Sequence, residues 1–188
     1  MFWLKKPAPT DPLAVSMSGV KLGDRLLVVG CADPALVAQL AQKTGLTGRA
    51  CVAGEDARGV EAASRAIERE GVLVETITAP VTSLPFEADA FDVVVLRDVV
   101  GAVDEHRRPA CVAEALRVLR PGGRCVVIDT AARKGIGALL HKRTVDPEYV
   151  ASGGAERALR SGGFRAVRRL AEREGLAFVE GVKATART

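Results

Sequence analysis

Apolar runs and amphipathic segments alternate along the chain from residue 26 to residue 129. Leu26 to Gly30 is continuously apolar, which is typical of a strand buried on both faces of a parallel sheet. Similar runs predict further strands at residues 50–53, 72–77, 91–96 and 124–129. The segments between them repeat apolar residues at helical spacing and predict helices over about 34–44, 57–70 and 105–119. This alternation predicts a doubly wound α/β fold with a mostly parallel sheet.

The two ends of the chain follow a different pattern. Residues 1–20 contain three prolines and are predicted to form an extended arm, and residues 21–188 to form a single domain. Residues 133–162 are predicted to be helical but interrupted by glycine and proline. Residues 164–170 and 176–184 predict a closing hairpin, which brings the sheet to seven strands.

Composition places the chain among single-domain globular proteins. It has 188 residues, of which 48% are hydrophobic and 27% charged. No apolar run approaches the roughly 20 residues that span a bilayer. The four cysteines lack metal-type spacing and suit buried positions in a reducing compartment, so a cytoplasmic location is expected. His106 and His141 lie far apart and have no ligand-like companions, so no metal site is predicted.

Positive charge is concentrated in the C-terminal half of the chain. The net charge is +4, and most basic residues after the fifth strand lie between residues 133 and 169. Such a cluster can attract phosphates, nucleic acid or an anionic membrane. Because few aromatic residues are interleaved with it, a solvated basic face is favoured over nucleic-acid binding.

Two motifs occur in a recognisable order. Leu84 to Leu96 is a proline-containing turn that enters an apolar strand, and Leu116 to Arg124 is a helix end followed by a Pro-Gly-Gly turn. Together they resemble the fourth and fifth strands of class I S-adenosylmethionine-dependent methyltransferases, especially the type-11 group that includes quinone-biosynthesis methyltransferases. The resemblance covers about residues 20–184. It implies a Rossmann-like fold, S-adenosylmethionine as cofactor, and methyl transfer to an acceptor that the sequence does not identify.

The first cofactor loop matches that family in part. Ligands of open α/β sheets bind beyond the carboxyl ends of the strands, which here places Gly30, Cys31, Ala32 and Asp33 at the methionine part of the cofactor. Gly30 and Cys31 fit the family pattern, whereas Ala32 and Pro34 replace glycines and Val28 replaces an acid. A left-handed backbone at Ala32 would cost about 1 kcal/mol more than at glycine.

The second and third loops depart further from the family pattern. The acid that accepts the ribose hydroxyls is expected at Gly54, and Glu55 and Asp56 follow one and two residues late. Either could bind ribose, or both could stabilise the N-terminus of the following helix. In the third loop Pro80 replaces an acid, so backbone groups of Val81 and Thr82 are the expected adenine contacts.

Chemistry is expected near the ends of the fourth and fifth strands. Asp98 is predicted as a catalytic pocket residue, and Arg97 as a cofactor contact, although the two could instead pair with each other. His106 is a second catalytic candidate because imidazole titrates in a useful range, although a surface role at a helix start is the alternative. Asp129 and Tyr149 are further candidates.

Two functions from different classes remain open. The first is methyl transfer from S-adenosylmethionine. The second is a non-catalytic methyltransferase-like domain that binds or assembles, which the altered loops favour. Phe2, Trp3 and Leu4 are expected to dock on their own domain or on a neighbouring subunit of a homodimer, or to touch a membrane with help from the lysines that follow.

Overall fold

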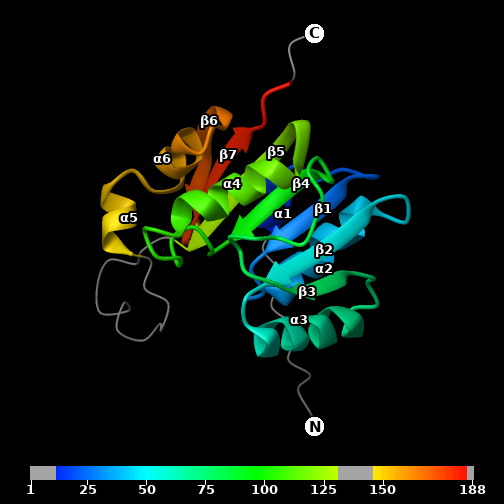
Figure 1. Ribbon diagram of the computed structural model, residues 1–188. Coiled ribbons are helices and arrows are strands. Elements are labelled where there is room, and N and C mark those ends of the chain that lie inside the picture. The colour runs from blue at the N-terminus through cyan, green and yellow to red at the C-terminus, as the bar shows by residue number, and fades with distance from the viewer. Residues whose placement is uncertain (1–11, 131–145, 186–188) are drawn as a thin grey trace.

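A seven-stranded sheet with strand order β3-β2-β1-β4-β5-β7-β6 runs through the molecule (Figure 1). The computed structural model describes residues 12–130 and 146–185. The strands are β1 Arg25–Val29, β2 Arg49–Gly54, β3 Glu75–Thr78, β4 Phe91–Arg97, β5 Leu119–Thr130, β6 Arg165–Arg173 and β7 Leu176–Val182. β1 to β5 pair in parallel, and β7 is antiparallel to both β5 and β6. The predicted fold class, a mostly parallel seven-stranded sheet that ends in an antiparallel hairpin, is confirmed.

Helices cover both faces of the sheet. They are α1 Pro12–Ser18, α2 Pro34–Thr44, α3 Ala57–Arg69, α4 Arg108–Val118, α5 Pro147–Ala151 and α6 Gly154–Ser161. The buried side chains of α4, α5 and α6 share one apolar cluster with the sheet, and those of α1, α2 and α3 share the other. In Figure 1, α4 and α6 lie in front of the sheet and α1 and α2 behind it. The molecule is therefore a three-layer α/β/α sandwich with a core on each side of the sheet.

Local signals set the ends of the helices as the sequence predicts. The side chain of Asp33 accepts a hydrogen bond from the Leu36 N–H at 3.1 Å, and Pro34 occupies the first turn of α2. Gly45, with a φ angle of 66°, ends that helix. In α3, the buried residues Val60, Ala63 and Ile67 are spaced as one face of a helix.

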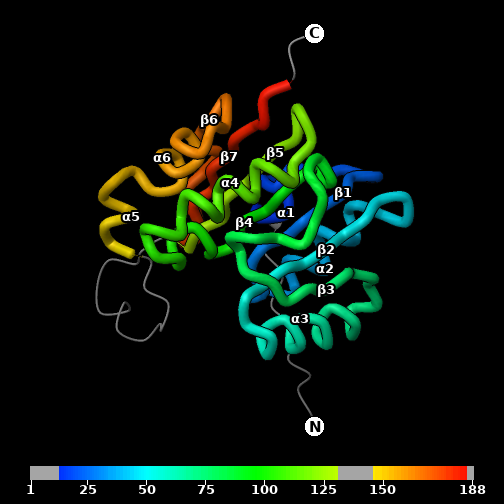
Figure 2. The backbone as a smooth tube through the Cα atoms, viewed as in Figure 1, coloured from blue at the N-terminus to red at the C-terminus, as the bar shows by residue number. Residues whose placement is uncertain are grey.

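The direction of winding reverses between β1 and β4. Figure 2 shows the blue-to-green first half of the chain forming β1, β2 and β3 in one direction, and the green-to-red second half forming β4, β5, β7 and β6 in the other. Because β1 and β4 are neighbours, the connections after them leave toward opposite faces of the sheet. A ligand-binding crevice is expected at this switch point, beyond the carboxyl ends of the strands.

The structure corrects several predicted boundaries. The extended arm is wrong for Pro12–Ser18, which form α1 because Ala14 buries in the apolar cluster that α2 shares with the sheet. Residues 1–11, with the predicted docking of Trp3, lie outside the described residues, as do residues 131–145 with His141. α4 starts at Arg108 rather than at residue 105, and β3 starts at Glu75 rather than at residue 72. β5 begins at Leu119 because the Pro-Gly-Gly turn forms a bulge within that strand's pairing with β4.

Arg108 and Tyr149 hold α5 against the sheet. The Arg108 guanidinium donates to the carbonyl oxygens of Val100 and Val103 and to the carboxylate of Asp146, and lies 4.7 Å from the centre of the Tyr149 ring. The Tyr149 hydroxyl donates to Asp129 Oδ2 at 2.7 Å. Asp129 is only 8% exposed, and its other oxygen, Oδ1, has no hydrogen-bond partner among the described residues. Burial raises the pKa of Asp129 to about 6, against the effect of the Tyr149 hydrogen bond.

This buried carboxyl predicts a pH dependence of stability. Because the folded-state pKa of Asp129, about 6, exceeds its ordinary value of about 3.9, its stabilising contribution is complete below about pH 4 and is lost as the pH rises through 6. Asp129→Asn removes the charge, so its free energy of unfolding relative to wild type should rise by up to about 3 kcal/mol between pH 4 and pH 8. Urea unfolding at several pH values measures this difference. Glu87→Gln, at an exposed position, is the control; a pH-independent difference for Asp129→Asn would contradict the assignment.

Candidate functional site

A hollow of about 330 Å³ lies at the switch point, beyond the carboxyl ends of β1, β2 and β4. Of the eleven residues predicted from the sequence for the site, eight line it: Gly30, Cys31, Ala32, Glu55, Asp56, Val81, Arg97 and Asp98. Asp33, Thr82 and His106 do not line it. Loops that are up to about 70 residues apart in sequence therefore converge as the topology requires.

Gly30 allows the ends of β1 and β4 to approach closely. Its φ angle is 106°, and a Cβ atom at this position would lie 2.4 Å from the carbonyl oxygen of Arg97. Its N–H donates to the Ala53 carbonyl at 2.8 Å, which continues the ladder to β2. Glycine is therefore required here by backbone packing alone.

The end of β2 has no room for the expected acid. Gly54 is the last residue of the strand, and a Cβ atom there would lie 2.5 Å from the Cys31 sulfur. Cys31 thus occupies the space into which a side chain at position 54 would extend. Gly54, the departure from the family pattern at the end of β2, thus fits sterically against Cys31 at the end of β1.

Glu55 connects three of the loops around the hollow. Its Oε1 accepts a hydrogen bond from the Val81 N–H at 3.1 Å, and the guanidinium of Arg107 donates to both carboxylate oxygens. Burial opposes ionisation, but the hydrogen bonds from Arg107 and Val81 outweigh it and lower the pKa of the Glu55 carboxyl. The Val81 N–H, expected at adenine, is used by this contact.

Asp56 and Asp33 act as helix caps. The carboxylate of Asp56 accepts from the Arg58 N–H at 3.3 Å and the Gly59 N–H at 2.9 Å at the start of α3. Asp33 caps α2, and its Oδ2 lies 3.9 Å from Arg97 Nε. Of the two readings that the sequence left open for Asp56, the structure shows a helix-start role.

Arg97 and Asp98 pair with each other and with the end of β5. Arg97 Nη1 donates to Asp98 Oδ2 at 2.6 Å, while Asp98 accepts from the backbone N–H of Thr130 at 2.6 Å and from its hydroxyl at 2.9 Å. Asp98 has a left-handed backbone, with φ 52°, which turns the chain sharply after β4. Arg97 Nε is buried and makes no hydrogen bond among the described residues. The site therefore offers one N–H without a hydrogen bond, on a guanidinium that already forms ion pairs with Asp98 and Asp33.

The remaining predictions have mixed outcomes. The φ angle of Ala32 is not positive, so the anticipated strain is absent and only its methyl group narrows the hollow. His106 is exposed in the turn before α4, outside the lining. Arg107 was not predicted from the sequence because its partner lies 52 residues away. The apolar wall of Val99, Ala102 and Val103 was not predicted either, although the apolar run after β4 was an available signal.

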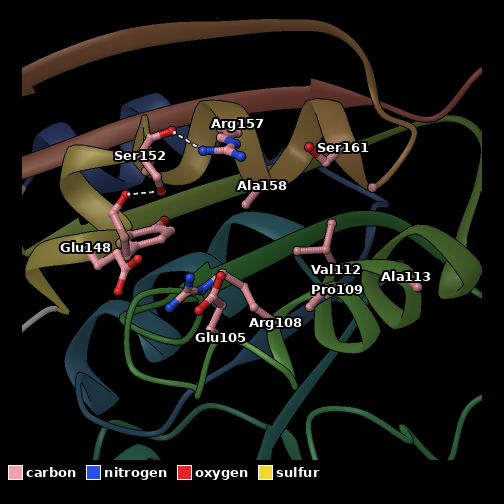
Figure 3. A pocket seen from close by; sticks show the side chains of 13 residues that line it. Glu105, Arg108, Pro109, Val112, Ala113, Glu148, Ser152, Arg157, Ala158 and Ser161 are labelled. Atoms are coloured by element: carbon pink, nitrogen blue, oxygen red, sulfur yellow. Dashed lines mark hydrogen bonds between the residues drawn. The ribbon is translucent and has the colours of Figure 1, made fainter.

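Two larger hollows lie elsewhere. A groove of about 530 Å³ separates α4 from α5 and α6, and in Figure 3 Arg108 and Pro109 face Ser152 and Ala158 across it. A third hollow of about 690 Å³ lies at the amino ends of β2 and β3. Of these three hollows, only the smallest lies at the carboxyl-end switch point, where open α/β sheets bind ligands.

Electrostatic features of the other candidate groups favour structural roles. Cys51, Cys111 and Cys125 are buried free thiols, and burial raises the pKa of Cys51 to about 11 and that of Cys111 to about 12. Across residues 12–130 and 146–185, no group of three or more His, Cys, Asp or Glu side chains could hold a metal ion. In the same part of the chain, no helix is long and apolar enough to cross a membrane.

Comparison with known proteins supports the fold and shows the family. Residues 27–127 match a family model described as a methyltransferase domain. The ubiquinone/menaquinone biosynthesis C-methyltransferase UbiE of Pseudomonas fluorescens is 28% identical over 130 residues, which cover 68% of this chain and 49% of that protein. The UbiE protein of Stutzerimonas stutzeri is 29% identical over 117 residues, which cover 61% of this chain and 45% of that protein. The chain thus spans about half the length of the curated relatives it matches.

Solved structures share the fold at low sequence identity. A SAM dependent methyltransferase from Aquifex aeolicus superposes with a TM-score of 0.74 at 20% identity, over 92% of this chain and 89% of that one. The [4+2]-cyclase SpnF superposes with a TM-score of 0.69 at 17% identity, over 93% of this chain and 80% of that one. A shared fold therefore does not specify one reaction.

Asp56→Ala should destabilise the fold rather than weaken the binding of a ligand. Loss of the cap on α3 should cost about 1 kcal/mol of unfolding free energy, and Asp56→Asn, which keeps an accepting oxygen, should cost much less. Urea unfolding measures both variants, and calorimetric titration with S-adenosylhomocysteine should show nearly unchanged affinity. Unchanged stability together with lost binding would reassign Asp56 to the ribose.

Proposed function

Because the chain belongs to the methyltransferase-domain family, we propose that it transfers a methyl group from S-adenosylmethionine, bound in the hollow at the switch point, to a small acceptor. The observation that carries the proposal is the convergence of eight predicted site residues in that one hollow. Its volume of about 330 Å³ lies at the lower end of the range for small-molecule sites.

The residues present fit the cofactor in three places. The unsatisfied Arg97 Nε suits an anionic group, and the carboxylate of the methionine part would satisfy it. Glu55 is the acid at the end of β2 whose side chain lines the hollow and carries accepting oxygens for a ribose diol. Val99, Ala102 and Val103 provide the apolar wall against which a flat base can pack.

The bound cofactor supplies an activated methyl group on a sulfonium. The protein then has to place the acceptor in line with that methyl group, which can supply much of the rate. A base is needed only if the acceptor must lose a proton. Asp98, our predicted catalytic residue, lines the hollow, but both of its oxygens already accept hydrogen bonds, so its first role is to orient Arg97 and Thr130.

For the acceptor, the names of the curated relatives point to carbon methylation of a quinone precursor. The identity is below 30% and the match covers about half of those proteins, so a quinone precursor is the first acceptor class to test. When the protein and S-adenosylmethionine are incubated with a phenolic ring that lacks its ring methyl group, S-adenosylhomocysteine should form faster than without that acceptor. Binding of the cofactor with no formation of S-adenosylhomocysteine on such a ring would contradict this acceptor class.

The alternative function is that of a methyltransferase-like domain without catalysis. It is favoured by one specific observation: the carboxylate of Glu55 is already paired with Arg107 and Val81. Calorimetric titration with S-adenosylmethionine and S-adenosylhomocysteine separates the two functions, because a purely structural domain should bind neither.

We expect weak binding that Ala32→Gly strengthens. Removal of one methyl group from the wall of the hollow should relieve crowding of about 1 kcal/mol, or roughly fivefold in affinity. Ala35→Gly, on the exposed face of α2, is the matched control and should leave affinity unchanged. Submicromolar binding of S-adenosylhomocysteine by wild-type protein, with no effect of Ala32→Gly, would contradict the crowding argument.

A further inference from the structure

The acid assigned to the ribose is held by an arginine that follows the loop of Val99 and Val103, two residues that line the hollow. Glu55 follows β2, whereas Arg107 precedes α4. Arg107 Nη1 donates to Glu55 Oε2 at 3.4 Å, and Arg107 Nη2 donates to Oε1. This ion pair therefore joins the loop after β2 to the turn before α4 beside the hollow.

The hydrogen-bonding capacity of Glu55 is nearly filled. A carboxylate has about four accepting sites, two on each oxygen. Oε1 accepts from Val81 and from Arg107, and Oε2 accepts a longer bond from Arg107. A ribose diol that donates one hydroxyl to each oxygen needs a site on Oε1 that is already occupied. Arg107 and the diol consequently compete for the same carboxylate.

We propose that Arg107 is a latch on the cofactor site, which the ribose must displace from Glu55 for the cofactor to bind. The proposal rests on the function proposed above. It makes Arg107 a residue that lowers cofactor affinity without touching the reacting atoms. It also explains why the carboxylate of Glu55 lines the hollow and yet accepts hydrogen bonds from other residues of the protein.

The ion pair between Arg107 and Glu55 is weak enough for a ligand to displace. The side chains of Arg107 and Glu55 are 42% and 38% exposed, so solvent screens their attraction. The neighbouring charge of Asp104 also acts on Arg107, which gives the displaced guanidinium another anionic environment nearby. Pairs of this exposure change equilibria by up to about fivefold.

Calorimetric titration with S-adenosylhomocysteine tests the latch directly. Arg107→Ala should bind about two- to fivefold more tightly than wild type, because the competing donor is gone. Raising the ionic strength from about 10 mM to about 1 M shortens the screening length from about 30 Å to about 3 Å. Wild-type affinity should therefore increase with salt toward that of Arg107→Ala, whose own affinity should stay constant. Arg107→Lys, which cannot form the two-pronged contact, should lie between them.

Arg49 provides the matched control. It forms an exposed two-pronged pair with Glu75 at the other end of β2, with distances of 2.9 Å and 2.6 Å. Arg49→Ala removes a pair of the same kind from the same strand but away from the hollow, and should leave affinity and its salt dependence unchanged. A gain in Arg49→Ala equal to that in Arg107→Ala would assign the effect to general charge and overturn the latch.

A double-mutant cycle confines the effect to one pair. In a Glu55→Gln background the ion pair is already absent, so adding Arg107→Ala should change affinity less than twofold. Weaker or unchanged binding by Arg107→Ala alone would overturn the latch while leaving the proposed function intact. If wild type, Arg107→Ala and Ala32→Gly all fail to bind S-adenosylhomocysteine, the proposed function fails and the latch with it.

Discussion

The parallel pairing of β1 with β4 is the contact on which the architecture depends. It places the two halves of the chain side by side with opposite directions of winding, so that the following connections diverge to the two faces of the sheet. The strand ends approach so closely at Gly30 that a single added carbon would overlap the Arg97 carbonyl oxygen. The hollow opens directly beyond this contact, and every residue assigned to the site is positioned relative to it.

Charged groups around this hollow already form hydrogen bonds within the protein itself. Asp33 and Asp56 begin helices, Asp98 binds Arg97 and Thr130, and Glu55 binds Arg107 and Val81. Each of these contacts stabilises a loop at the carboxyl edge of the sheet. A ligand here must either use what is left unsatisfied, such as Arg97 Nε, or replace an internal partner. The fold of a methyltransferase is thus retained while its contact chemistry is altered, a combination that also permits loss of catalysis.

A second group of buried polar side chains connects α5 to the sheet. Arg108 joins the loop after β4 to the start of α5, and Tyr149 packs beneath it with its hydroxyl on Asp129. The same loop lines the cofactor hollow through Val99 and Val103, so the helical face and the site share one connection. A buried carboxyl with one unsatisfied oxygen is costly when ionised, and this cost ties the stability of α5 to pH.

The sequence by itself determined the alternation of strands and helices, the two-sided burial of β1, and the helix start at Asp33. These features follow from local periodicity and from hydrogen bonds that span three residues or fewer, which a linear sequence displays directly. The resemblance also located the loops that meet at the hollow. Only the tertiary structure decided which side chains these loops share. The Cys31 sulfur fills the space at Gly54, and Arg107 reaches Glu55 across 52 residues of sequence. These contacts depend on how three loops that are far apart in the sequence pack within a few ångströms of one another. A local sequence pattern does not show such distances.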